Sequence, residues 1–426
     1  LILNEVLSDE SGGLAYIFTD ESGYVITSAD TDIQPVIAWS RNSDYVNDNN
    51  PLRDMVLADM QCRRANIPNL PQQLRHEHQQ SWQALTDGQK SSLTAYYPPE
   101  GTTESGGWME SEWNQGSPWN RLCPRDPEGE LRSYAGCPAV AMGQILNYHR
   151  TTNGMRLTDS DDYFHNWGTR RYHIDDDWEE RGFPSFPTLN AILDTLDMYY
   201  ADEVEPTMNQ IAALLFACGV TMQQVYSSEG SGTFGVSQAY SGYQRFGLFE
   251  STLLEEDIPR LYSDMQENLM DGFPVHFAVV TPAWDSGHNV VVDGWNTDDY
   301  YHVNFGWGGS YDGWYSLPDD IPYGLTVIEG VVVNIFPESG SISETKLPTA
   351  ATLTASPNPF NAACKIDIPQ GFTAAIYDVH GRQIHSLTDG SSIWNAAGQP
   401  SGVYLVRAQN GEKVIEKRVV LVRYEL

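Results

Sequence analysis

Residues 134–149, YAGCPAVAMGQILNYH, place one cysteine, Cys137, where a loop becomes a helix. Gly136 frees the loop from the restriction that a Cβ imposes, and Pro138 suits the first helical turn, where its missing N–H costs nothing. Unpaired amides and the positive end of the helix dipole favour a thiolate over a thiol at such a position. A cysteine beside a helix start is also common as a small core residue, so this stretch alone leaves both roles open.

Two later stretches supply the partners that a nucleophilic cysteine needs. Residues 287–296, GHNVVVDGWN, begin a β-branched run at His288, and residues 301–309, YHVNFGWGG, form a second strand that ends in a glycine-rich aromatic turn. A thiolate nucleophile needs a base that exchanges a proton near neutral pH, and a neighbour that fixes the ring of that base. His288 and Asn304 supply these roles from a predicted β-hairpin. A cysteine at a helix start, followed by a histidine and an asparagine on strands, is the chain order of papain-like proteases.

Together with WNQGSPWN at 113–120, these stretches resemble the streptopain-like family of secreted bacterial cysteine peptidases. The resemblance covers about 105–336, and the order and spacing of all the motifs fit. It implies a papain-like fold in which the side chain of Gln115 and the backbone N–H of Cys137 form the oxyanion hole.

Two positions depart from the pattern of that family. Pro138 stands where a small aliphatic residue is usual, which suits a helix start, and Phe305 stands where a tryptophan is common. Phe305 keeps an aromatic wall beside His288 and Asn304 but lacks an indole N–H. Trp307 is expected to shield the His288–Asn304 pair.

A glycine- and serine-rich loop at 226–235, YSSEGSGTFG, is a candidate border of the substrate cleft. The streptopain-like family has a similar loop at the border of its substrate cleft. The resemblance implies that Gly230, Ser231 and Gly232 lie beside the substrate, and that Gly136 does so too. A flexible connector has the same composition, so both interpretations remain open. The loop is not a phosphate-binding loop, because the lysine of that motif is missing.

The chain of 426 residues is long enough for two or three domains. It has no apolar run long enough to span a bilayer and no visible signal peptide. Since Leu1 is not a start methionine, we expect a processed product or a fragment. The formal net charge is −33, and residues 347–426, with 7 Lys+Arg and 6 Asp+Glu, carry none of that excess. An acidic body of this kind is repelled by nucleic acid and by anionic membranes.

The 5 cysteines are too few and too scattered for a disulfide framework or a CxxC metal site. Cys123 is the rival nucleophile, but no helix start follows it directly. Cys218, at the end of an apolar helix predicted at 209–218, is expected to lie in the core. The acidic stretches 158–162 and 175–177 lack the spacing of a known calcium loop, so solvated surface is favoured over calcium ligands. No metal and no organic cofactor is expected.

Other histidines are better suited to structural roles. His276 alternates with apolar neighbours, as a buried core histidine does. His302 shares one face of its strand with Asn304, which favours a structural hydrogen bond. His149 lies about 18 Å along the helix axis from Cys137, too far to touch the thiol.

Residues 1–104 are expected to form a separate α+β module. Short strands at 14–18 and 24–28 precede helices at 51–66 and 70–93. This order resembles the pro-domain of the same family, which implies an intramolecular inhibitor. An additional folding domain without a regulatory role is the alternative.

The segment that joins this module to the Trp113 motif has the composition of an activation site. Residues 98–107, PPEGTTESGG, are polar, flexible and open to proteolysis. Inhibition by the pro-domain would work by covering the cleft or by displacing the His288 hairpin, and the sequence does not choose between them.

After a linker at 337–346, residues 347–426 have the short strands and frequent turns of a small all-β sandwich. The segments 356–361, 374–382 and 400–407 resemble the C-terminal sorting domain of type IX secretion cargo. That resemblance implies export to the cell surface or the medium through the secretion machinery. An ordinary β accessory domain that binds carbohydrate or protein is the alternative.

The predicted fold class is therefore α+β: a papain-like cysteine peptidase domain at 105–336, preceded by an α+β pro-domain and followed by a small all-β sandwich. The predicted function is that of a secreted cysteine endopeptidase made as a zymogen. Cys137 attacks the scissile carbonyl, His288 acts as base and then protonates the leaving amine, and Asn304 orients His288. The expected partners are protein or peptide substrates, the pro-domain and the secretion machinery.

Two other functions remain open. A non-catalytic surface protein would use the peptidase fold for binding or adhesion, but a decayed site would be expected to lose at least one of Gln115, Cys137, His288 and Asn304. An amidase or acyltransferase that acts on cell-wall peptides would keep the same chemistry, and a papain-like fold does not decide between these reactions.

Overall fold

The computed structural model of the protein describes residues 1–45, 51–87, 106–126, 131–168, 170–255, 260–280, 287–317, 328–337, 353–356, 360, 363–368, 372–378, 382–387, 391–400, 402–410 and 413–421. Two compact units are present. The large unit comprises Leu1–Tyr97 and Thr102–Ser341, and the small unit contains Ile342–Leu426.

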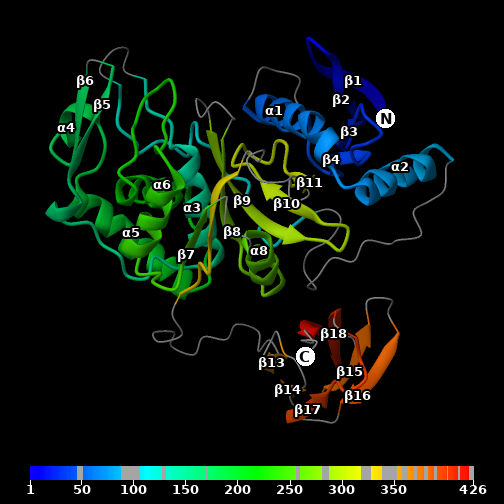
Figure 1. Ribbon diagram of the computed structural model, residues 1–426. Helices are drawn as coiled ribbons and strands as arrows, with labels where there is room; N and C mark the ends of the chain where they lie inside the picture. The colour runs from blue at the N-terminus through cyan, green and yellow to red at the C-terminus, as the bar shows by residue number, and fades with distance from the viewer. Residues whose placement is uncertain are drawn as a thin grey trace. The chain divides into compact units, whose positions relative to one another are not determined.

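One antiparallel sheet of ten strands runs through the large unit (Figure 1). In spatial order its strands are β1 (Ile2–Asp9), β2 (Gly12–Thr19), β3 (Tyr24–Ser28), β4 (Val36–Ser40), β11 (Gly313–Ser316), β10 (Tyr300–Asn304), β9 (Gly287–Trp295), β8 (Val275–Val280), β12 (Ile328–Val333) and β7 (Thr252–Glu255). The predicted strands at 14–18 and 24–28 are confirmed as β2 and β3. The predicted hairpin of His288 and Asn304 is confirmed as β9 and β10, which pair in antiparallel fashion.

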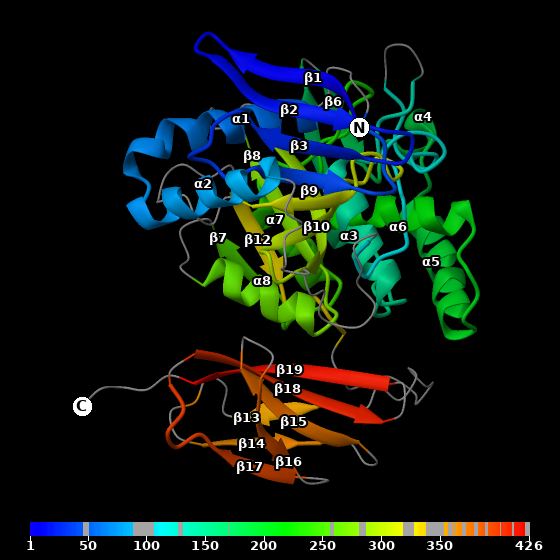
Figure 2. The same ribbon diagram turned by 90° about the vertical axis from the view of Figure 1, so that its right-hand side faces the viewer.

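The pairing of β4 with β11 joins the N-terminal strands to the strands of the hairpin. Trp39 lies opposite Trp314 in this register, and the two indole rings stack with centroids 6.0 Å apart. Figure 2 shows β1 to β4 running on into the rest of the sheet. The sequence predicts a separate module at 1–104. In the structure, the strands of this module instead extend the sheet of the downstream segment.

The helices at the N-terminus follow the first four strands. They are α1 (Pro51–Asn66) and α2 (Gln72–Thr86), separated by a 3₁₀ turn at Ile67–Asn69. The predicted helix at 51–66 is confirmed. The helix predicted at 70–93 begins two residues later and ends at Thr86, and residues 88–93 of the predicted range lie outside the described residues. On α1, Met60 is fully buried in one core with Ile17 and Ile26 of the neighbouring strands.

A second core lies on the other face of the sheet, around the helix that begins at Cys137. The elements of this part are α3 (Cys137–Tyr148), a 3₁₀ turn at Asp159–Asp161, β5 (Tyr163–Trp167), β6 (Arg170–Ile174), α4 (Trp178–Arg181), α5 (Phe186–Ala201), α6 (Met208–Thr221) and α7 (Val236–Arg245). A further helix, α8 (Leu261–Met270), packs its apolar residues into the first core instead.

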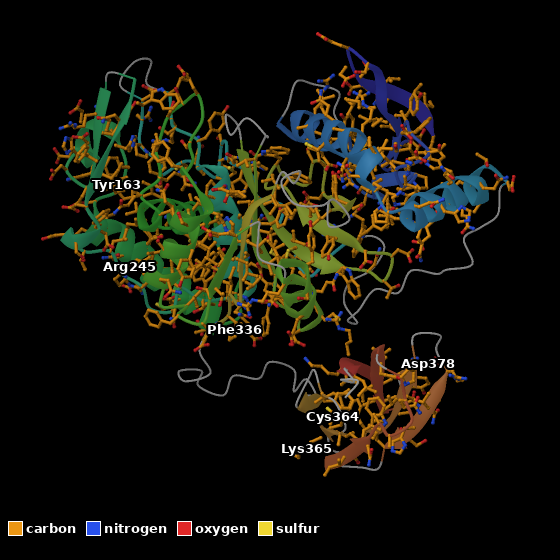
Figure 3. All side chains as sticks on the ribbon, viewed as in Figure 1. Tyr163, Arg245, Phe336, Cys364, Lys365 and Asp378 are labelled. Atoms are coloured by element: carbon orange, nitrogen blue, oxygen red, sulfur yellow. The ribbon has the colours of Figure 1, made fainter. Side chains whose placement is uncertain are left out.

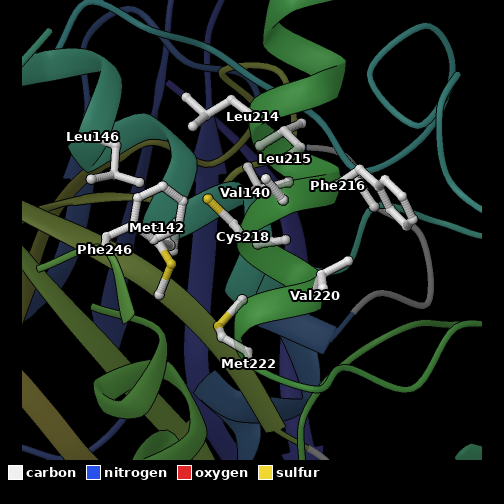
Figure 4. Packing of buried hydrophobic residues seen from close by; sticks show 14 of the residues in the cluster. Val140, Met142, Leu146, Leu214, Leu215, Phe216, Cys218, Val220, Met222 and Phe246 are labelled. Atoms are coloured by element: carbon white, nitrogen blue, oxygen red, sulfur yellow. The ribbon is translucent and has the colours of Figure 1, made fainter. Parts of the chain in front are cut away.

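Helices α3 and α6 pack closely because one residue between them has no side chain. A Cβ at Gly143 would lie 2.5 Å from a methyl group of Leu215, so any larger residue would displace that side chain. Figure 4 shows Val140 and Met142 of α3 among Leu214, Leu215 and Cys218 of α6. Burying a leucine side chain contributes about 1.5–3 kcal/mol, so this packing holds the start of α3 firmly in place.

The small unit is built from two sheets, in agreement with the predicted all-β sandwich. One sheet has the order β13 (Thr354–Ser356), β14 (Ala363–Asp367), β17 (Ser391–Asn395), and the other has the order β16 (Gln383–Leu387), β15 (Thr373–Asp378), β18 (Gly402–Asn410), β19 (Lys413–Leu421). Along β14, Cys364 is buried and Lys365 is exposed, the alternation of a strand with one covered face (Figure 3). Trp394 and Tyr404, whose rings meet edge to face at 5.1 Å, lie in the core of this unit.

In the part of the chain that the structure describes, no helix combines the length and the apolar character needed to cross a bilayer.

Candidate active site

Cys137 is the first residue of α3, as the sequence predicts. Gly136 before it adopts a left-handed φ of 87°, and a Cβ there would lie 2.3 Å from Oε1 of Gln224. Glycine is therefore required both for the backbone angle and for the close approach of Gln224. Pro138 occupies the first turn without loss of a hydrogen bond.

The thiol of Cys137 is neutral in this arrangement. Burial raises its pKa to about 11, although N–H groups of Asn289 and the backbone N–H of Cys137 itself act in the opposite direction. From the sequence, a thiolate is expected at this helix start. The structure differs because the loss of solvation outweighs the donors, so the helix terminus alone does not ionise the sulfur.

Gln115 lies in a segment that connects the Cys137 loop with the aromatic turn. Its carbonyl oxygen accepts a hydrogen bond of 2.8 Å from the N–H of Ala135, two residues before Cys137. Two residues upstream, the carbonyl of Trp113 accepts a bond of 3.0 Å from the N–H of Gly308. The half-buried Gln115 therefore lies close to the start of α3, in the region where the sequence predicts the oxyanion hole.

His288 is buried and its ring is held by the aromatic turn. Its Nε2 donates a hydrogen bond of 2.8 Å to the carbonyl oxygen of Phe305, and its ring stacks on Trp307 with centroids 4.3 Å apart. Phe305 is nearly parallel to the imidazole at 6.3 Å. Burial lowers the pKa of His288 to about 4, so the imidazole is uncharged at neutral pH. Trp307 is expected from the sequence to shield both His288 and Asn304. In the structure its ring covers His288.

The amide of Asn304 makes its hydrogen bonds to groups other than His288. Its Oδ1 accepts bonds from Nε2 of Gln144 at 2.9 Å and from the N–H of Gly306 at 3.0 Å, and its Nδ2 donates to the carbonyl of Ser111 at 2.8 Å. Among the described residues, no hydrogen bond joins Asn304 to His288 or His288 to Cys137. The structure therefore brings these residues into one region of the fold without assembling the predicted Cys–His–Asn constellation.

Strand alternation explains why Asn289, and not His288, lies on the face of β9 toward α3. Successive side chains of β9 point to opposite faces of the sheet. Asn289 lies on the face toward α3, where it acts to lower the pKa of the Cys137 thiol, while His288 lies on the other face with Phe305 and Trp307.

Gln144 is a further residue of this region that sequence reasoning missed. It is fully buried on α3, and its Oε1 accepts hydrogen bonds from the hydroxyl of Ser111 at 3.0 Å and the N–H of Trp113 at 3.1 Å, while its Nε2 donates to Asn304. A signal was present, because Gln144 is a polar residue inside an apolar helical run and lies two turns after Cys137 on the same helix face.

The central place of Gln144 leads to a prediction about stability. Gln144→Leu roughly keeps the volume of the side chain. It removes the acceptor of the Trp113 N–H and one donor to Oδ1 of Asn304. Buried groups left without partners cost about 1–3 kcal/mol each, so we expect a loss of about 2–4 kcal/mol in the free energy of unfolding. Urea unfolding measures it, with Gln73→Leu on the exposed face of α2 as the matched control. Equal stability of the two variants would contradict the linking role.

The glycine- and serine-rich loop closes on itself beside the Cys137 segment. Val225 and Gly232 exchange two backbone hydrogen bonds, of 2.9 and 3.0 Å, and the hydroxyl of Ser231 accepts a bond of 3.0 Å from the N–H of Ser227. The carbonyl of Ser227 in turn accepts a bond of 3.1 Å from the N–H of Tyr134. Gly230, Ser231 and Gly232 are thus tied to the chain three residues before the cysteine.

Cys123 and Cys218 do not compete as nucleophiles. Cys123 and Cys218 are fully buried, as expected for Cys218, and burial raises the pKa of the Cys123 thiol to about 12 and that of the Cys218 thiol well above its usual value. Both are therefore neutral and shielded from solvent.

The remaining histidines and acidic groups have structural partners. His302 forms an ion pair of 2.7 Å with Asp293, which agrees with its predicted structural role. In the acidic stretches, Asp161 pairs with Arg245 at 2.7 Å (Arg245 is labelled in Figure 3) and Asp177 accepts the N–H of His173 at 2.8 Å. Within the described ranges, no group of three or more His, Cys, Asp and Glu side chains is arranged to hold a metal ion.

Comparison with known protein families gives three matches along the chain. Residues 4–62 match the Spi protease inhibitor family, residues 113–315 match the peptidase C10 family, and residues 355–422 match the secretion system C-terminal sorting domain. They follow the order predicted from the sequence, and the sorting domain indicates a secreted or cell-surface protein.

Individual relatives agree with these matches. The chain is 28% identical over 206 residues to the thiol protease/hemagglutinin PrtT of Porphyromonas gingivalis, covering 47% of this chain and 22% of that protein. It is 28% identical over 232 residues to streptopain of Streptococcus pyogenes, covering 48% of this chain and 53% of that protein. The alignments thus span about half or less of the length of these relatives.

Among solved structures, a fragment of prointerpain A from Prevotella intermedia superimposes with a TM-score of 0.51 at 20% identity, covering 79% of this chain and 99% of the fragment. A similarity at this level of identity bears on the fold alone. It confirms the predicted papain-like α+β fold.

Proposed function

Because residues 113–315 belong to the peptidase C10 family, we propose that the chain is a secreted cysteine endopeptidase made as a zymogen. One observation carries the proposal. Cys137 begins a buried helix whose loop is bonded to the Gln115 segment, and that segment is bonded in turn to the aromatic turn that covers His288. The family match favours hydrolysis of peptide bonds over adhesion or the modification of cell-wall peptides.

The proposed reaction uses an acyl-enzyme intermediate. Once His288 reaches Cys137, it takes the thiol proton, and the sulfur attacks the scissile carbonyl to form a C–S bond. The negative charge on the former carbonyl oxygen is held by the backbone N–H of Cys137 and the side chain of Gln115. His288 then protonates the amine as the C–N bond breaks. Water attacks the resulting thioester with the same histidine as base, the C–S bond breaks to release the carboxylic acid, and the proton held by His288 returns to the sulfur.

The intact chain has the features of a latent enzyme. Cys137 is a neutral thiol. His288 lies on the other face of β9, and its Nε2 donates a hydrogen bond to the carbonyl oxygen of Phe305. Activation on this proposal requires His288 to reach the sulfur, with Asn304 exchanging one of its present partners for the imidazole.

The N-terminal module contacts the part of the chain that would have to move. The hydroxyl of Tyr24 donates to the carbonyl of Tyr311 at 2.6 Å, and the hydroxyl of Ser43 donates to the carbonyl of Gly309 at 2.6 Å. Both acceptors follow Trp307 in the turn between β10 and β11, and β11 itself pairs with β4. These contacts favour inhibition by displacement of the His288 hairpin over inhibition by covering of the cleft, the two possibilities that the sequence leaves open.

The test compares the full chain with a chain that begins near Gly106, using denatured casein as substrate. Residues 98–105 of the expected activation site lie outside the described residues, so the cut is defined by sequence alone. We expect a lag for the full chain that prior cleavage in 98–107 removes, and labelling of Cys137 by a thiol-directed epoxide identified by mass spectrometry. Absence of casein hydrolysis by either form would overturn the proposed activity. Equal initial rates from both forms, with the uncut chain verified intact, would overturn the zymogen.

Gln115 provides a separate prediction about the oxyanion hole. Gln115→Ala in the activated chain should lower kcat by about 10²–10³ with little change in KM, because a donor to the oxyanion acts in the transition state. Steady-state kinetics on a chromogenic peptide measure both constants, and Gln223→Ala on the surface is the control. An effect on KM alone would make Gln115 a substrate-binding residue.

A further inference from the structure

The backbone of Ala135, two residues before Cys137, is held from both sides. Its N–H donates a hydrogen bond of 2.8 Å to the carbonyl of Gln115, and its carbonyl accepts one of 2.8 Å from Nε2 of Gln224. Ala135 and Gln224 have no exposed surface, so water does not compete for the bond between them. These two bonds form a clamp on Ala135 that joins the Gln115 segment and the chain after α6 to the cysteine loop.

Gln224 is itself fixed at the end of α6. Its backbone N–H donates to the carbonyl of Gly219 at 2.9 Å, and its carbonyl accepts a bond of 2.7 Å from the hydroxyl of Tyr163 on β5. Figure 4 shows the end of α6, where Met222 lies in the packed core. The side-chain amide of Gln224 therefore reaches the cysteine loop from a tightly packed part of the fold.

The amide of Gln224 has one favourable orientation. Its nitrogen faces Ala135, because an oxygen in that place would meet the carbonyl oxygen of Ala135. Its Oε1 then lies against Gly136, 2.3 Å from the point that a Cβ would occupy, and it has no hydrogen-bond donor among the described residues. A buried acceptor without a partner lowers stability, so a contribution to folding alone does not account for a glutamine at this place.

The clamp matters because the next residue is a glycine. Gly136 has a φ of 87° and the conformational freedom of a residue without Cβ. On the side of α3, its carbonyl accepts a bond of 3.0 Å from the N–H of Val140. On the other side, the two bonds of Ala135 hold the chain that leads into it. The direction of the Cys137 N–H relative to the Gln115 side chain thus depends on both ends of Gly136.

We propose that Gln224 is a positioning residue of the oxyanion hole, which holds the carbonyl of Ala135 and thereby keeps the backbone N–H of Cys137 aligned with the side chain of Gln115. The inference rests on the proposed function in one respect, that these two groups bind the oxyanion. Gln224 has no exposed surface and acts through the backbone of 135–137. Oxyanion donors act in the transition state and need precise aim, so loss of the clamp should affect kcat more than KM.

The kinetic test replaces Gln224 by methionine, which keeps the length of the side chain and removes the donor. In the activated chain we expect kcat on a chromogenic peptide to fall about tenfold, with KM changed by less than about twofold. The matched control is Gln244→Met on α7, which loses a bond of 3.3 Å to the carbonyl of Leu248 and one of 2.8 Å to the hydroxyl of Ser251. Wild-type kinetics in Gln224→Met, or a rise in KM with kcat unchanged, would overturn the positioning role.

A double variant separates positioning from a general effect on the fold. Gln115→Ala removes the donor whose alignment Gln224 maintains. In that background Gln224→Met should lower kcat by no more than about threefold, against about tenfold in the wild-type background. An equal loss in both backgrounds would mean that Gln224 acts independently of the oxyanion hole, and would overturn the inference.

Thermal unfolding of each variant checks that the fold is kept. If Gln224→Met does not fold, Gln224→Asn takes its place in both comparisons. That variant keeps an amide but withdraws it from Ala135 by one methylene group.

Hydrogen exchange in the uncut full chain tests the clamp without turnover. Mass spectrometry of a peptide that contains residues 134–140 reports how often the bond from the Ala135 N–H to Gln115 opens. We expect exchange at least about fivefold faster in Gln224→Met than in Gln244→Met, and equal rates would overturn the clamp. Absence of casein hydrolysis by the wild-type activated chain would instead overturn the proposed function, so the two failures are distinguishable.

Discussion

Replacing Cys137 by serine is expected to abolish the hydrolysis of peptide bonds by the activated chain, with kcat lowered by about 10⁴–10⁶. A hydroxyl is far less acidic than a thiol, and a base arranged to accept a thiol proton activates it poorly. The exchange of sulfur for oxygen adds no volume at the half-buried start of α3, so the fold should be kept. Any remaining rate would come from substrate binding and the oxyanion hole.

This prediction is checked by measuring peptide hydrolysis, epoxide labelling and thermal unfolding on the same preparation. Cys62→Ser, at a half-buried position on α1, is the control for the chemical change alone. We expect that control to hydrolyse peptides at the wild-type rate after activation. Activity retained in Cys137→Ser, or labelling at Cys123 in place of Cys137, would contradict the assignment of the nucleophile.

Local signals in the sequence were sufficient for the start of α3 and for the hairpin. Gly136 and Pro138 act within their own turn, and the apolar alternation after His288 is a property of one strand, so neither depends on distant parts of the chain. The union of β4 with β11 is different. It brings Trp39 against Trp314, far apart in sequence, and no local pattern around either residue shows that an N-terminal strand extends this sheet.

The candidate site shows the same division between local and non-local causes. The position of Cys137 at a helix start was predictable, but its protonation state was not, because burial by the folded chain outweighs the helix terminus. Alternation predicts that His288 and Asn289 point to opposite faces. Which of the two faces α3 depends on how the sheet is placed against that helix, and this is a property of the whole unit.

Replacing His288 by alanine is expected to lower kcat of the activated chain nearly as much as the loss of Cys137. The two residues act as one unit, so removal of either removes most of the rate, and the double variant should be little worse than the single ones. Asn304→Ala should cost less, because an orienting residue transfers no proton. Peptide hydrolysis by the single and double variants, with circular dichroism to verify folding, measures these effects.

The structure adds a second expectation that separates the intact chain from the activated one. In the intact chain the imidazole of His288 is bonded to Phe305 and stacked on Trp307, and it makes no bond to Cys137 among the described residues. His288→Ala should therefore leave the pH profile of Cys137 alkylation unchanged before cleavage. After cleavage the same substitution should displace that profile to higher pH, because the protonated base stabilises the thiolate. An identical displacement in both forms would mean that His288 already contacts the sulfur in the latent chain.

Equally mild losses of kcat in His288→Ala and Asn304→Ala would contradict the assignment of His288 as the base.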